Sequence, residues 1–66
     1  MKVHINGESR EFPDPQTVST LLQAAGYAKL RVAVEVNREI VPKSRHASHA
    51  MADGDRVEII QAIGGG

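Results

Sequence analysis

Three glycines, Gly64, Gly65 and Gly66, stand at the end of the sequence, and the group there that could take part in chemistry is the carboxylate of Gly66. A carboxylate becomes an electrophile once its charged oxygen is replaced by a leaving group, because a nucleophile can then attack the acyl carbon. Glycine has no Cβ, so a glycine tail is thin, adaptable and open to close approach by another molecule. These residues fit a tail whose end reacts inside a partner's active site, although inert flexible tails are also rich in glycine.

The rest of the chain offers little catalytic machinery of its own. It has no cysteine, which excludes disulfides, cysteine-ligated zinc, iron–sulfur clusters and thiol catalysis, so any sulfur would come from elsewhere. Its 66 residues predict one domain, with a core too small to enclose a typical ligand pocket of about 300–1,000 Å³. A chain of this kind presents a group to a larger partner, and we expect it to bind no cofactor.

Three histidines, His4, His46 and His49, are the residues that could ligate a metal. His46 and His49 are spaced i, i+3 and could share one face of a helix, which is a spacing that zinc sites use. No third ligand accompanies them in any motif, so we interpret the three as surface residues and expect no metal site.

The charges of the sequence are balanced, with eight Lys and Arg against eight Asp and Glu. This balance lacks the basic excess of a nucleic-acid-binding domain. No apolar run is long enough to span a bilayer and no signal-peptide pattern is present, so we expect a cytoplasmic protein with no nucleic-acid or membrane partner. Two local clusters could be solvated surface or could steer a partner enzyme: a basic one at Arg38, Lys43 and Arg45, and an acidic one at Asp53, Asp55 and Glu58.

The elements that position the tail begin with a predicted hairpin. Met1, Val3 and Ile5 alternate with polar residues, which is typical of a half-buried strand. Asn6-Gly7 is the dipeptide that best suits a type I′ turn, so a second strand should run to about Phe12. The proline-containing segment 13–15 then ends the pairing.

The next segment predicts one helix. Thr17 can cap it, and Gly26 stands where a left-handed residue ends a helix. Position 20 holds Thr where a capping box has Glu or Gln, which predicts a partial cap. The apolar face of this helix is formed by Val18, Leu21, Leu22 and Ala25.

Three further strands are predicted over residues 31–37, 38–42 and 55–63, with a helical turn or loop at 43–52 from which Met51 enters the core. In the last strand Val57 and Ile59 share one face, while Ile60 and Ala62 share the other. One helix lying across a mixed sheet of about five strands is the simplest way to bury these faces. We therefore predict an α+β, ubiquitin-like β-grasp domain over residues 1–62 and a flexible tail over 63–66. Its first and last strands should be close together, and its core should contain Val3, Ile5, Leu21, Val34, Val57 and Ile59.

Several phrases of the sequence are specific enough to suggest a family. They are Asn6-Gly7 after the first strand, "TVSTLL" at the helix start, "VAVEVNREIVP", "DGDRVEI" before the last strand, and the terminal glycines. With these phrases the chain resembles, nearly end to end, the ThiS family of sulfur carriers of thiamine biosynthesis. The stretch "SRHASHAMA" departs from the family in being more polar and richer in alanine.

The resemblance implies a carrier that is a substrate of other enzymes and is not itself an enzyme. An E1-like enzyme would use ATP to adenylate the carboxylate of Gly66, with Gly65 as the other half of the terminal pair. Sulfur from a cysteine-derived persulfide would then convert the acyl-adenylate to a thiocarboxylate, and thiazole synthase would take that sulfur.

An apolar patch should lead to this tail, because one helix covers one face of the sheet. Ile60, Ala62 and Ile63 are the candidate partner-docking residues, although scattered exposed apolar residues are also ordinary. Two alternatives stay open: a sulfur carrier of the molybdopterin-synthase type, and a ubiquitin-like module that binds partners without covalent chemistry.

Overall fold

The protein was analysed as a computed structural model that describes residues 1–61. The elements follow the order ββαββ, then a short 3-10 turn, then β. They are β1 (Lys2–Ile5), β2 (Glu8–Glu11), α1 (Val18–Ala25), β3 (Val32–Val36), β4 (Glu39–Val41), η1 (Lys43–Arg45) and β5 (Arg56–Gln61). Within the described residues no helix is both long and apolar enough to cross a membrane.

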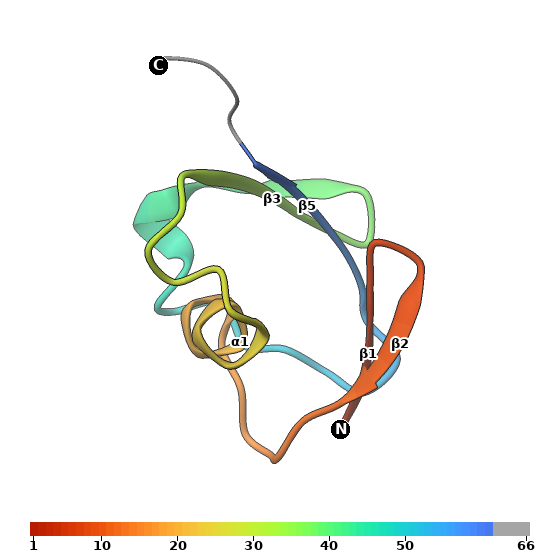
Figure 1. Cartoon of the computed structure of the whole chain (residues 1–66). Coiled ribbons are helices and arrows are strands. Elements are labelled where there is room, and N and C mark those ends of the chain that lie inside the picture. The colour runs from red at the N-terminus through yellow and green to blue at the C-terminus, as the bar shows by residue number, and fades with distance from the viewer. Residues whose placement is uncertain (62–66) are drawn as a thin grey trace.

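The strands form one mixed sheet in the order β2-β1-β5-β3-β4, with α1 and η1 on the same side of it (Figure 1). β5 lies in the middle, parallel to β1 and antiparallel to β3. The hairpins β1–β2 and β3–β4 form the two edges. The predicted mixed sheet with one main helix is therefore confirmed, including the proximity of the first and last strands.

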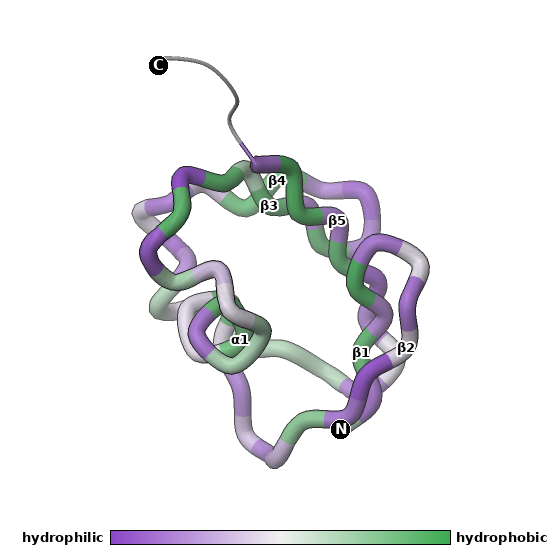
Figure 2. Tube along the Cα trace, in the orientation of Figure 1, coloured by the Kyte–Doolittle hydropathy of each residue, from purple (hydrophilic) through white to green (hydrophobic). Residues whose placement is uncertain are grey.

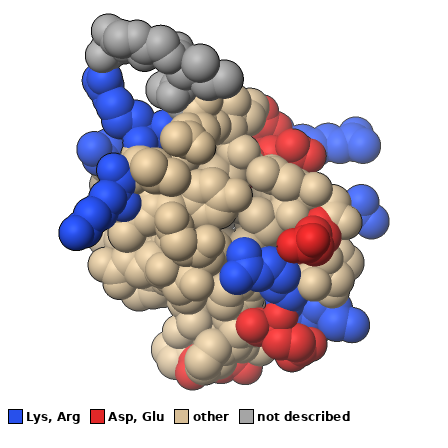
Figure 3. All heavy atoms as spheres, in the orientation of Figure 1, with Lys and Arg blue, Asp and Glu red and all other residues tan. Residues whose placement is uncertain are grey.

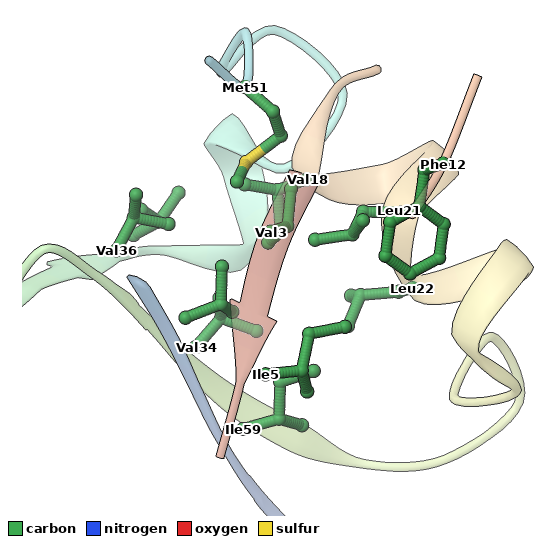
Figure 4. Packing of buried hydrophobic residues seen from close by; sticks show 12 residues of the cluster. Val3, Ile5, Phe12, Val18, Leu21, Leu22, Val34, Val36, Met51 and Ile59 are labelled. Carbon is green, nitrogen blue, oxygen red and sulfur yellow. The ribbon is translucent and has the colours of Figure 1, made fainter. Parts of the chain in front are cut away.

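The core lies between the sheet and α1, and it contains all six residues predicted for it. Figure 4 shows side chains of α1 meeting those of the strands, and Figure 2 shows hydrophobic stretches along β1, β3 and β5. Met51 is also buried, as the sequence predicts, and so is Phe12 at the end of the first hairpin. The twelve buried residues of the cluster are Val3, Ile5, Phe12, Val18, Leu21, Leu22, Val34, Val36, Val41, Met51, Val57 and Ile59.

Helix α1 has a complete capping box, so the prediction of a partial cap is wrong. The Thr20 amide donates to Oγ1 of Thr17 at 3.2 Å, and the Thr17 amide donates to Oγ1 of Thr20 at 2.8 Å. A threonine hydroxyl can thus replace the longer Glu or Gln side chain at this position. At the other end Gly26 has φ 92°, the left-handed conformation expected of it.

The polar segment after β4 attaches to the start of α1 through main-chain hydrogen bonds. The amides of Val18 and Ser19 donate to the carbonyls of His49 and His46 at 3.0 and 2.8 Å. The first amides of a helix have no partner within it, so these bonds satisfy them. The attachment needs few apolar side chains, which explains how the alanine-rich stretch can be part of this fold.

Candidate functional site

The site begins at β5, because this strand leads to the predicted reactive tail. β5 pairs with β3 from Val57 to its last residue, Gln61, which lies opposite Val32. On its other side the pairing with β1 reaches Ile5, which lies opposite Val57. The β1 edge therefore ends before β5 does, and another group must complete the pairing there.

The side chain of Asn6 supplies that group. Its Nδ2 donates to the Ile59 carbonyl at 3.1 Å, and its Oδ1 accepts from the Ile59 amide at 2.8 Å. The Asn6 main-chain amide also donates to the carbonyl of Val57 at 2.9 Å. A side-chain amide thus pairs with β5 as a further strand residue would, and it holds the strand two residues before its end.

Asn37 holds the beginning of β5 from the side of β3. Its main-chain amide donates to the Arg56 carbonyl at 2.7 Å, and its Oδ1 accepts from the Arg56 amide at 3.0 Å. Asn6 and Asn37 have φ of 50° and 51°, a left-handed conformation in which asparagine is enriched. Sequence reasoning assigned Asn6 to the turn alone and missed both contacts with β5.

The sheet face opposite α1 carries an apolar patch beside the end of β5. Ile60 is 58% exposed, and its neighbour across the strands is Ala33 of β3. Ile40 of β4 is 73% exposed and lies opposite Glu35, on the same face as Ala33. Ile60, Ala33 and Ile40 form what we call the open-face patch, and sequence reasoning found only the first of them.

Two carboxylates border the open-face patch. Glu35 and Glu58 lie directly opposite each other on β3 and β5, an arrangement that is unfavourable for like charges. Local conflicts of this kind are expected at functional surfaces. The patch therefore offers a partner an apolar surface with an acidic border.

The predicted charged clusters do not stay together in the fold. Asp53 accepts from the Lys2 amide, and Asp55 accepts from Asn37 and from the Ala52 amide, so both stabilise turns. Glu58 is separate from them on the open sheet face. In the basic cluster, Lys43 and Arg45 are in η1, whereas Arg38 belongs to the β3–β4 turn.

The three histidines are all half-buried, so none is the exposed surface residue that the sequence predicted. His46 is half-buried, with its Nε2 3.1 Å from the Val41 carbonyl, because the segment after β4 folds back on α1. Within residues 1–61 no group of three or more His, Cys, Asp or Glu could hold a metal ion. The remaining predicted site residues, Ala62, Ile63, Gly64, Gly65 and Gly66, lie outside the described part of the chain.

A single helix across a five-stranded mixed sheet, with the central last strand leading to the C-terminal glycines, defines the chain as a β-grasp protein. The ThiS family model matches residues 3–66, and the chain belongs to the ThiS family. Relatives that match the chain over nearly its whole length include sulfur carrier proteins named ThiS.

Known proteins agree with this assignment over the whole chain. The sulfur carrier protein ThiS of Escherichia coli is 32% identical, with full coverage of both chains. A crystal structure of the thiamine biosynthesis protein ThiS from Geobacter metallireducens superposes with a TM-score of 0.85, at 30% identity and full coverage of both chains.

One similarity extends to a larger protein. The chain is 53% identical, over all 66 residues, to part of a thiazole synthase from Paramagnetospirillum magneticum. It spans 20% of the length of that relative. A thiazole synthase from Magnetococcus marinus shows the same coverage at 35% identity.

Proposed function

We propose that the carboxylate of Gly66 carries the sulfur as a thiocarboxylate. An E1-like enzyme first joins this carboxylate to AMP, with release of pyrophosphate from ATP. The outer sulfur of a persulfide then attacks the acyl carbon and displaces AMP. A thiol cleaves the S–S bond of the resulting acyl disulfide, which leaves the thiocarboxylate on the carrier and a disulfide on the donor side. Thiazole synthase receives the sulfur from the carrier. The observation that carries the proposal is the family match, which runs from the first strand through the last glycine.

Thiazole synthase is the proposed acceptor because a segment like this chain occurs within thiazole synthases. A carrier joined to its acceptor in one polypeptide fits a direct transfer of sulfur between them. This similarity also favours thiazole formation over a carrier of the molybdopterin-synthase type. The alternative of a non-covalent module predicts no change at Gly66 at all.

Intact mass spectrometry tests the covalent function. The 66-residue chain is incubated with the adenylating enzyme, ATP, a persulfide donor and a thiol reductant, and a matched reaction omits ATP. We expect the full reaction to add the mass difference between sulfur and oxygen, located in the C-terminal peptide. An unchanged mass in the presence of an active enzyme would contradict the carrier function of this chain.

We further propose that the open-face patch docks the enzymes that act on the tail. An apolar surface beside the root of the tail orients that tail without occupying its reactive end. Ala62 and Ile63, which follow β5 in the sequence, are proposed as further docking residues.

Ile60→Asp should weaken binding to the adenylating enzyme by about tenfold or more, because it puts a charge at the centre of a desolvated contact. The free energy of unfolding should fall by less than about 1 kcal/mol, since Ile60 is exposed. Ser9→Asp is the matched control, because Ser9 lies on the same sheet face at the far edge, opposite His4 of β1. Calorimetric titration and thermal melting of both variants measure the two effects. Equal affinities for the two variants would show that Ile60 is not part of the docking surface.

A further inference from the structure

A groove on the helix side of the sheet is not used by the proposed chemistry. It has a volume of about 440 Å³ and lies between α1, the connection from α1 to β3, and the η1 segment. It is an open surface groove, so it does not conflict with the expectation that the small core encloses no ligand. Its walls combine apolar side chains with cations.

The apolar side chains that line the groove include one that is exposed to solvent. Leu22 of α1 is buried at its base, while Leu30 in the connection is 42% exposed. Tyr27 and Val32 line it and pack against the core with partial exposure. Leu30 is one of three large apolar side chains that the described residues leave exposed, and the other two belong to the open-face patch.

The charged part of the groove has one sign. Arg31 and Lys43 line it from two different segments, and no Asp or Glu is among its lining residues. Neither cation forms a salt bridge with any residue in the described part of the chain. Figure 3 shows blue side chains without red ones on the side of α1–β3 and η1, whereas blue and red alternate on the opposite side. The two cations would therefore attract a ligand that carries carboxylates, and no carboxylate of the groove would repel it.

The groove adjoins the root of the tail. Val32 lines it, and Val32 is the strand partner of Gln61, the last residue of β5. The open-face patch flanks the same root from the other side of the sheet, through Ala33 and Ile60. A protein that receives the tail can thus contact the carrier on both faces of the sheet.

We propose that the groove binds a segment of the adenylating enzyme in which carboxylates flank one apolar side chain. The carboxylates would pair with Arg31 and Lys43, and the apolar side chain would pack on Leu22 and Leu30. This inference rests on the proposed function and adds a second, oppositely charged contact to the acidic-bordered patch. It has a physical reason: a cationic surface beside the tail attracts an acidic part of the enzyme, which favours docking of the carrier before its tail enters the active site.

The test compares two double variants of the 66-residue chain. Arg31→Glu with Lys43→Glu reverses the groove cations. Lys29→Glu with Arg45→Glu is the control, because each exposed residue lies two positions away on the same segment, does not line the groove and gives the same change in net charge. ATP–pyrophosphate exchange gives kcat and KM for the carrier and for ATP, at low and high salt, and melting curves verify that both variants are folded.

We expect the groove variant to raise the KM for the carrier about tenfold or more at low salt, with kcat and the KM for ATP unchanged. The control should stay within about threefold of the wild type, and high salt should reduce the difference between them. Equal KM values for the two variants would overturn the inference, as would a change confined to kcat. A raised KM for ATP would place the nucleotide in the groove instead, which also overturns it. Absence of exchange with the wild-type chain would count against the proposed function itself.

Discussion

Leu21→Ala is expected to lower the free energy of unfolding by about 2–5 kcal/mol, because it removes buried methyl groups and leaves a cavity. Leu21 has no exposed surface, and in Figure 4 its side chain lies between those of Val3 and Phe12. A chain of this size has a total stability of roughly 3–10 kcal/mol by the per-residue rule. One truncation can therefore remove a large part of it.

Leu30→Ala is the matched control for this prediction. The substitution is the same, but Leu30 is 42% exposed, so we expect a loss below about 1 kcal/mol. Urea unfolding of the three chains, followed by far-ultraviolet circular dichroism, gives the comparison. A similar loss in both variants would show that α1 does not anchor the core as the packing implies.

Much of the fold could be predicted because its signals are local. The alternation of Val3 and Ile5 with polar residues places β1, and the dipeptide Asn6-Gly7 places the turn after it. The sequence predicts only a partial cap because a capping box usually has Glu or Gln at the position of Thr20. In the structure the hydroxyl of Thr20 accepts from the Thr17 amide within the first turn of the helix. His46 was assigned to the surface because its inward turn depends on how the following segment folds back on α1.

The site was predictable only where strand parity determines it. Ile60 follows the buried Ile59, so its exposure follows from the alternation of a strand. Ile40 belongs to a strand of three residues, and its place in the patch depends on the register with β3. The contact between Asn6 and Ile59 joins residues 53 positions apart, and the groove joins three segments. Such features come from the tertiary fold, and no local pattern encodes them.

A chain ending at Gly65 should be adenylated about a hundredfold more slowly than the full chain, although it should fold equally well. Gln61 is fixed to β3 through its register with Val32, and Asn6 holds β5 two residues earlier, so the tail starts from a defined position. Removing one residue shortens the reach from that position by about 3.3–3.6 Å. A displacement of about 1 Å can already cost a hundredfold in rate.

The remaining glycines make this prediction informative, because a chain ending at Gly65 still presents Gly-Gly at its end. If the adenylating enzyme measures the distance from the docked domain, the shortened chain reacts slowly. If the enzyme recognises the terminal dipeptide alone, the two chains react at the same rate.

A chain of full length with Gly64→Ala serves as the control. It keeps the length of the tail and restricts the backbone of one residue, so it should lose much less activity than the shortened chain. Pyrophosphate exchange at matched concentrations decides between the two forms of recognition, and equal rates for the chains ending at Gly65 and Gly66 would exclude recognition by length.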